Sequence, residues 1–514
     1  MNRINEAPIK VLHNASIYGH PGADTIVLEQ DRIRAIGRSS ELESLSLEST
    51  RAERIDLEGQ IVLPGFIDAH IHLIHTGLVE SGWRVDLANL SRDGALDALA
   101  QEAVHRDGDW VVGTGWDESH WQDRTYLTKA ELDRIAPRSP MLAIRMDGHL
   151  LTANSLAMKH IPPTASEHLI EWDTGILREQ AVDAMAESVR PDATCVGEAI
   201  DAAARLCHRL GITTAHTMSR LEFFEGFMKR REQRRLRITI CPDMHSFDKL
   251  VAVGLKTGYG DLWLRFGGMK VFADGSIGAR NAAVSEPYAG GGLGELNQTD
   301  ELLMEYVKRA DHAGWQTVIH GIGDRAIDQI LRTHEALRTD VSLHHRIEHF
   351  ELPQPCQIRR VKAAGLHLCM QPNFIANWSG PNSLYVDRLG VRRDQLSNPL
   401  RAICDADIPL AFGSDGMPPS PLFGIHGALH GAYEGQRITV EEAIFCYTGA
   451  GARLGFEGAV KGQLEPGALA DLVILDEDPR VNPEHVSDRS IRMTWVGGDL
   501  VYCAQSPTTN GARE

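Results

Sequence analysis

A strand-like apolar segment runs into two histidines in Gln60-Ile61-Val62-Leu63-Pro64-Gly65-Phe66-Ile67-Asp68-Ala69-His70-Ile71-His72. Side chains two residues apart on a strand project from the same side, so the imidazoles of His70 and His72 face one point. Taken alone, the pair fits two solvated loop histidines as well as a metal site. Its meaning depends on the strands that follow it along the chain.

Seven more apolar, strand-like runs follow, and helical stretches such as 197–210, 301–313 and 325–337 lie between them. The predicted strands cover 212–215, 237–241, 269–272, 316–319, 345–348, 367–371 and 408–412. Alternating strands and helices favour parallel βα units. With the first strand they make eight, which predicts an α/β fold closed as a (β/α)8 TIM-like barrel.

The spacing of the strands also predicts the domain organisation. About 140 residues separate the first two strands, which indicates an insertion at about residues 80–195 within a barrel spanning 61–455. Residues 1–60 and 456–514 hold short β-rich runs, each too few to close a sheet alone. We therefore expect the two chain ends to pair into one small β-sandwich domain.

Composition excludes several classes of protein. The chain has 514 residues with a net charge of −18, so nucleic acid and anionic membranes are not expected partners. The N-terminus lacks the apolar region of a secretory signal, and no run of ~18 apolar residues is present. Eight cysteines without CxxC spacing suggest a reducing compartment, and we expect a cytoplasmic protein.

Further ligand-type side chains close three later strands. His320, His349 and Asp415 each end a separate strand, and the carboxyl ends of barrel strands meet at one face. With His70 and His72 they make a donor set suited to zinc and, less exclusively, to manganese, iron or cobalt.

Lys270 lies inside an apolar strand, where an unpaired ammonium is costly to bury. One explanation is a buried ion pair with Asp274 or Glu348. The other is reaction of the amine with CO2, which gives a carbamate able to bridge two metal ions.

The order HxH, strand-borne lysine, His, His and Asp resembles the amidohydrolase superfamily. Several further segments resemble its family 3, the YtcJ-like branch that includes N-substituted formamide deformylase, and the resemblance covers residues 8–503. These segments are Gly115-Trp116-Asp117, Asp147-Gly148-His149, Asp274-Gly275-Ser276-Ile277-Gly278-Ala279-Arg280, Gly323-Asp324-Arg325-Ala326 and Gly467-Ala468-Leu469-Ala470-Asp471-Leu472-Val473.

The resemblance implies a metal-dependent hydrolase that cleaves an amide-like C–N bond of a small molecule. It places His70, His72, Lys270, His320, His349 and Asp415 at the ligand positions of one or two divalent ions, zinc being the expected metal, with a CO2-derived carbamate on Lys270. The cysteine that D-aminoacylases of this family use near their metals has no evident counterpart. A homo-oligomer is compatible with the resemblance.

Divalent cations lower the pKa of bound water and polarise a carbonyl, so we expect attack by metal-bound hydroxide. Asp415 would carry the proton to the leaving nitrogen, unless it is purely a structural ligand. Arg280 and Arg325 are candidates for binding a substrate carboxylate or for pairing with neighbouring aspartates. Trp116 and His149 are candidates for the pocket wall or, for the aromatic residues, a packed core.

Other functions remain open at this stage. The same metal site would serve an esterase, a deaminase or an isomerase, and a barrel that binds metal without catalysis is a further alternative.

Overall fold

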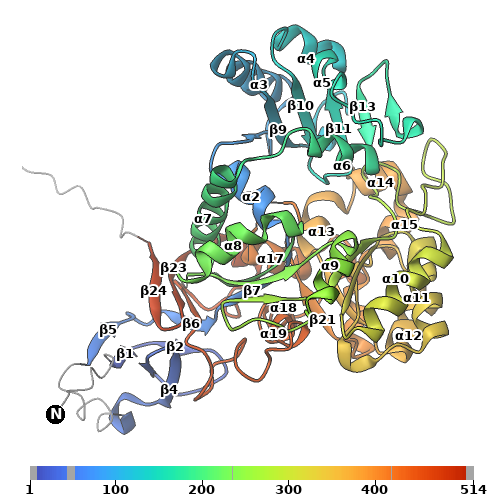
Figure 1. Ribbon diagram of the computed structural model, residues 1–514. Coiled ribbons are helices and arrows are strands. Elements are labelled where there is room, and N and C mark those ends of the chain that lie inside the picture. The colour runs from blue at the N-terminus through green and yellow to red at the C-terminus, as the bar shows by residue number, and fades with distance from the viewer. Residues whose placement is uncertain (1–8, 43–51, 234, 418, 505–514) are drawn as a thin grey trace, which may run out of the picture.

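The computed structural model describes residues 9–42, 52–233, 235–417 and 419–504. Figure 1 shows the sheets of the chain ends at the lower left, the parallel strands with their helices in the centre, and the insertion at the top. The largest hydrophobic cluster lies between the parallel strands and the helices around them. No helix in the described ranges is long and apolar enough to span a membrane.

Parallel strands form two sheets, with the orders β16-β15-β14-β7 and β17-β18-β19-β20-β21. Their bounds are β7 (Phe66–Ile71), β14 (Ile212–Met218), β15 (Arg237–Cys241), β16 (Leu264–Phe266), β17 (Met269–Phe272), β18 (Thr317–Gly321), β19 (Arg346–His349), β20 (His367–Met370) and β21 (Leu410–Phe412). Isolated bridges pair Asp243 with Lys270 and Ile71 with Asp415, so the two sheets touch at two places. The predicted α/β alternation is confirmed.

The first predicted strand, 60–68, is two strands. β6 (Ile61–Pro64) pairs with a C-terminal strand, whereas β7 pairs in parallel with β14. The break falls at Pro64 and Gly65, where a Cβ on Gly65 would lie 2.3 Å from the Thr213 side chain. The chain thus passes from one sheet into the other between β6 and β7.

Helices flank these strands in the predicted positions. The three predicted stretches correspond to α7 (Ala193–Arg209), α10 (Asp300–His312) and α11 (Asp324–Leu337). α7 begins earlier than predicted because the Asp192 carboxylate accepts the Cys195 N–H at 2.8 Å and caps the helix. The others include α2 (Leu73–Glu80), α8 (Phe224–Arg231), α9 (Phe247–Ala252), α12 (Pro355–Ala364), α13 (Pro372–Trp378), α14 (Leu384–Leu389), α15 (Val391–Leu396), α16 (Leu400–Asp405), α17 (Pro421–His430), α18 (Val440–Cys446) and α19 (Gly449–Leu454).

The segment between α2 and α7 folds around its own six-stranded sheet, in the order β12-β13-β11-β10-β9-β8. Its strands are β8 (Val85–Asp86), β9 (Val111–Trp116), β10 (Met141–Arg145), β11 (Leu150–Ala153), β12 (Ile170–Glu171) and β13 (Ile176–Arg178). Its helices are α3 (Arg92–Arg106), α4 (Lys129–Ile135), α5 (Ser155–Met158) and α6 (Gln180–Glu187). Separate hydrophobic clusters fill it, so this segment carries its own core.

Strands from both chain ends share one sheet, in the order β2-β6-β22-β23-β24. It combines β2 (Ser16–Ile17) and β6 with β22 (Leu472–Leu475), β23 (Ile491–Val496) and β24 (Asp499–Cys503). A second sheet contains β1 (Ile9–His13), β3 (Thr25–Glu29), β4 (Arg32–Gly37) and β5 (Glu53–Asp56). Gly497 and Gly498 connect β23 to β24 with φ of 58° and 77°, the positive values of a type I′ hairpin turn.

A buried ion pair joins the C-terminal segment to the parallel strands. Arg237 of β15 donates to the two carboxylate oxygens of Asp471 at 2.7 and 2.9 Å. Its guanidinium also lies 4.1 Å from the centre of the Trp263 ring. Removing one partner of such a pair leaves a buried charge uncompensated.

We therefore expect a chain that ends at residue 459 to be insoluble. It would lose β22, which pairs with β6, and Asp471, which neutralises Arg237. Comparing its soluble yield and circular dichroism with those of a chain ending at Ala504 tests this. A soluble, folded chain of 459 residues would contradict the account.

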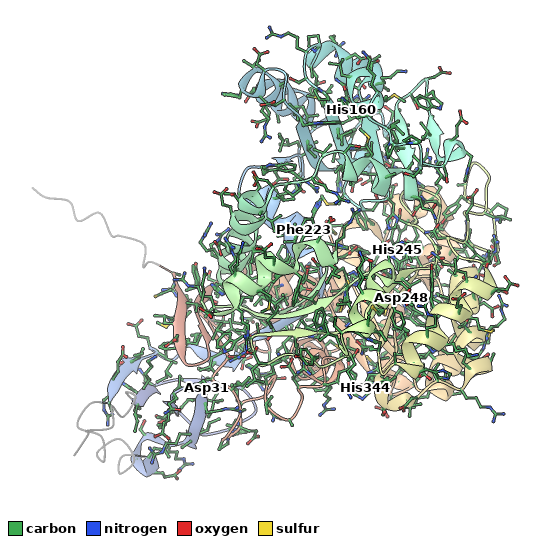
Figure 2. The ribbon with its side chains drawn as sticks, in the orientation of Figure 1. Asp31, His160, Phe223, His245, Asp248 and His344 are labelled. Atoms are coloured by element: carbon green, nitrogen blue, oxygen red, sulfur yellow. The ribbon has the colours of Figure 1, made fainter. Side chains whose placement is uncertain are left out.

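Four histidines pack at the opposite end of the strands from the insertion. His334 and His345 lie with ring centres 5.1 Å apart, and His344 and His367 stack at 4.4 Å. Figure 2 shows His344 at the lower edge of the molecule, far from His160 in the insertion. Burial lowers the pKa of His334 to about 3 and that of His367 to about 4.

These lowered pKa values make the fold sensitive to acid. Histidines of the unfolded chain take up protons below their ordinary pKa of about 6.5, whereas the buried His334 and the half-buried His367 stay neutral in the folded state. Stability is therefore expected to fall between pH 6.5 and 4, by up to ~1.4 kcal/mol per pH unit for each histidine. Urea unfolding measured at each pH should show a shallower decline for His334→Gln, and an unchanged slope would contradict this assignment.

Candidate metal centre

Backbone contacts bring the ends of β7 and β21 together, with His70, His72 and Asp415 on them. The N–H of Asp415 donates to the carbonyl of His70 at 2.7 Å, and that of His72 donates to the carbonyl of Asp415 at 3.3 Å. Gly413 permits this approach, because a Cβ there would lie 2.5 Å from the His70 nitrogen. The three side chains are thus held together by the backbone itself.

The Asp415 carboxylate lies between two imidazoles. Its Oδ1 is 3.0 Å from His72 Nε2 and 3.2 Å from His70 Nε2. Burial alone would raise the pKa of Asp415, but the neighbouring imidazoles of His70 and His72 hold it well below its usual range. Ligand atoms of all three residues lie within 4.8 Å of one another, close enough to share one cation.

The other nitrogen of His70 is held by a buried carboxylate. Nδ1 donates to Glu348, which accepts Arg346 Nε at 2.5 Å and Nη2 at 2.9 Å. Burial would raise the pKa of Glu348, but Arg346 and His70 lower it strongly, so Glu348 is an anion. A carboxylate on Nδ1 leaves the Nε2 lone pair free, as in metal-binding histidines.

His320 and His349 end the neighbouring strands β18 and β19. Their ring centres are 4.4 Å apart, and His349 lies 5.1 Å from His70. Burial lowers the pKa of both imidazoles well below the usual range, and at His349 this outweighs the opposing charge of Asp415. They are therefore neutral, the form that binds metal ions.

Lys270 of β17 lies in the same region with a buried, unpaired amine. Its Nζ is 4.6 Å from the centre of the Phe272 ring and makes no hydrogen bond to the described residues. The ion pair considered with Asp274 or Glu348 is absent there, because both carboxylates have other partners. Asp274 accepts three backbone N–H groups, and Glu348 is bound by Arg346 and His70.

These residues fit a metal ion. Within the described ranges, His70 Nε2, Lys270 Nζ and His349 Nδ1 are all buried without a hydrogen-bond partner. A buried polar atom left unsatisfied costs about 1–3 kcal/mol, so a cluster of them indicates a missing ligand. Imidazole nitrogens beside a carboxylate are donors that suit zinc and similar divalent ions.

A cavity opens beside this group. His320, His349 and Asp415 line it, together with Arg145, Asp147 and His149 from the insertion. Aromatic side chains of Phe374, Trp378 and Tyr385 form another part of its wall. The insertion therefore contributes directly to the space next to the candidate ligands.

Of the four residues suggested for substrate binding, His149 lines this cavity and the others do not. Trp116 is fully buried, donates its Nε1–H to the Ala143 carbonyl at 3.0 Å and stacks on Trp121. Arg280 is exposed, and Arg325 lies half-buried in the first turn of α11. The packed-core alternative therefore applies to Trp116.

The arginine that does line the cavity is Arg145, which the sequence patterns did not single out. Its guanidinium donates to Glu118 at 2.9 and 3.2 Å and to Asp147 at 2.8 Å. Two carboxylates thus already balance its charge.

A cysteine lies beside the cluster, contrary to the sequence-based inference. Cys369 of β20 is buried, and its sulfur lies within 4.8 Å of ligand atoms of His70 and Glu348. Burial raises the pKa of its thiol well above the usual range, so the thiol stays protonated. No local motif marks Cys369 or Glu348, although a glutamate directly before His349 in an apolar strand is an unusual signal.

Comparisons with known proteins agree with this geometry. The model of the amidohydrolase family matches residues 53–502. The Bacillus subtilis amidohydrolase YtcJ is 28% identical, over 93% of this chain and 96% of its own length. N-substituted formamide deformylase of Arthrobacter pascens is 25% identical, over 93% and 95%.

Among solved structures, an uncharacterized metal-dependent hydrolase of Pyrococcus furiosus superposes with a TM-score of 0.74 and 28% identity, covering 92% of this chain and all of that one. The likeness extends the α/β TIM-like barrel fold to this protein and identifies it as a metal-dependent hydrolase. The chain belongs to the amidohydrolase family.

Proposed function

We propose that the protein hydrolyses an amide-like C–N bond of a small molecule. The observation that carries this proposal is the cluster of His70, His72, His349 and Asp415, which holds unpartnered buried nitrogens beside a cavity. Two relatives, named an amidohydrolase and an N-substituted formamide deformylase, support the choice of bond.

The residues that would hold one or two divalent ions are His70, His72, Lys270, His320, His349 and Asp415, with zinc the ion that suits them best. When bound, such an ion lowers the pKa of a water molecule and polarises the acyl oxygen. The unpaired Lys270 amine supports a carbamate there. The ammonium would lose one proton to give the amine, whose nitrogen would then bond to the carbon of CO2 and lose a second proton, so that an anionic oxygen ligand replaces a cation.

Asp415 is the proton carrier in this proposal. Its carboxylate is anionic, lines the cavity and lies 3.0 Å from His72. It accepts a proton from the attacking water and passes it to the leaving nitrogen, because an unprotonated amide anion is a poor leaving group.

The cavity favours uncharged substrates with an apolar or aryl group. Phe374 and Trp378 offer an aromatic wall, with ring centres 4.7 Å apart. Arg145 is the one arginine among the lining residues, and Glu118 and Asp147 already neutralise it. A substrate carboxylate therefore has no free guanidinium to bind.

We also infer that the parallel strands form one closed (β/α)8 barrel, in which β16 and β17, separated only by residues 267 and 268, count as one interrupted strand. The barrel carries the insertion and is flanked by a small β-sandwich from both chain ends. The bridges between Asp243 and Lys270 and between Ile71 and Asp415 support closure. Pairing of β6 with β22 supports the shared small domain.

A substrate panel tests the proposed reaction. Zinc-loaded protein is expected to release an amine and a carboxylic acid from neutral N-substituted amides, with kcat/KM roughly tenfold or more above that for N-acyl amino acids. Both products are measured by liquid chromatography. Ammonia release from ring amidines without amide cleavage would indicate a deaminase instead. Binding of stoichiometric zinc without turnover of any amide would indicate a protein that binds metal without catalysis.

Substitutions at the candidate ligands are expected to have two different effects, one on kcat and one on metal occupancy. Asp415→Asn keeps the shape of the side chain but removes the proton acceptor, so kcat should fall ~10²–10⁴-fold while metal content changes little. His70→Ala or His72→Ala deletes a metal–nitrogen bond and should lower metal occupancy. Metal analysis and kcat are measured on the same preparations. Near wild-type kcat in Asp415→Asn would exclude the proton-carrier role.

A further inference from the structure

Glu179 occupies an unusual backbone position between β13 and α6. Its φ of 46° and ψ of −122° belong to a region that residues with a Cβ rarely adopt. Such a conformation persists only where surrounding contacts hold it. The side chain is 10% exposed, and its carboxylate has partners on three other residues.

The partners come from two separate segments of the chain. His149, also in the insertion, faces the carboxylate with Nδ1 at 3.0 and 3.1 Å. Asn281 and Asn297, in the segment after β17, donate their side-chain N–H groups, the second at 3.4 Å. Glu179 thus connects the insertion to the loop that follows Lys270.

That loop is shaped to receive the carboxylate. Asn281 Oδ1 accepts the Ser276 N–H at 2.8 Å, which turns the amide nitrogen toward Glu179. Asn297 is fixed in the same way, because its Nδ2 also donates to the Asp274 carbonyl at 2.9 Å. Gly275 leaves the necessary space, since a Cβ there would lie 2.3 Å from Glu179 Oε1.

The contact determines how His149 faces the cavity. Because Nδ1 faces Glu179, Nε2 is the ring nitrogen left to contact a substrate. The ring lines the cavity, 5.2 Å from the His320 ring. The backbone adds support, because the Glu179 N–H donates to the His149 carbonyl at 3.1 Å.

We propose that Glu179 is a positioning residue that holds His149 so that Nε2 hydrogen-bonds the scissile amide, with Asn281 and Asn297 holding Glu179 in turn. This inference rests on the proposed amide hydrolysis. A neutral imidazole would accept the amide N–H, and a charged one would donate to the acyl oxygen. The contact therefore exists in either protonation state.

A double-mutant cycle on zinc-loaded protein tests the coupling. His149→Ala is expected to lower kcat/KM by about 10²-fold, since misplacing a substrate contact has effects of this size. Glu179→Gln should lower it about tenfold alone and by less than twofold in the His149→Ala background, because coupled residues are not additive. Zinc content should stay at the wild-type level in all variants.

Glu171→Gln is the matched control, since it removes a partly exposed carboxylate of the insertion that pairs with Arg178 away from the cavity. It should leave kcat/KM unchanged. If Glu179→Gln lowers kcat/KM by the same factor with and without His149, Glu179 has only a structural role and the proposal is overturned. If Glu179→Gln does not fold, Asn281→Ala takes its place in the cycle and should show the same dependence on His149.

A crystal structure of the Glu179→Gln variant gives a readout that does not need turnover. The His149 ring is expected to rotate away from its wild-type position. An unmoved ring would overturn the positioning role. If the wild-type protein cleaves no amide, the proposed function fails, while the ring position still decides whether Glu179 positions His149.

Discussion

Parallel strands that end at one edge force the polar side chains after them into a small volume, and the rest of the site depends on this convergence. One such convergence joins β7 to the turn after β21, where the Asp415 N–H donates to the His70 carbonyl at 2.7 Å. Gly413 makes that approach possible. His72, His320 and His349 then come within reach of the same point from neighbouring strand ends.

A cluster of this kind is stable only if each buried charge and polar atom has a partner. Arg346 compensates Glu348, and Glu348 holds the Nδ1 face of His70. The opposite faces of His70, His349 and Lys270 stay without partners in the described chain. The Nδ1 atom of His70 is thus fixed by a hydrogen bond, whereas His70 Nε2, His349 Nδ1 and Lys270 Nζ are left available to bind metal ions.

Much of this arrangement could be predicted from sequence because it follows from strand periodicity. The spacing of His70 and His72 and the positions of His320, His349 and Asp415 identify strand ends one by one, and Lys270 is conspicuous as a charge inside an apolar strand. Contacts between distant segments have no such signal. Glu348 reaches His70 across 278 residues, and Arg145 and Glu179 enter the site from an insertion whose own sheet has to be built first. Arg280, Arg325 and Trp116 do not line the cavity, because proximity in a motif does not determine which way a side chain points.

Diffraction at the zinc absorption edge from crystals of the zinc-loaded protein tests the metal centre most directly. The account predicts an anomalous peak about 2.0–2.2 Å from His70 Nε2, His72 Nε2 and an Asp415 oxygen, with the Glu348 contact to His70 Nδ1 retained. It also predicts density for a carbamate beyond Lys270 Nζ. A fully active, zinc-replete protein with no peak at these three residues, or with Lys270 ending in an unmodified amine, would contradict it.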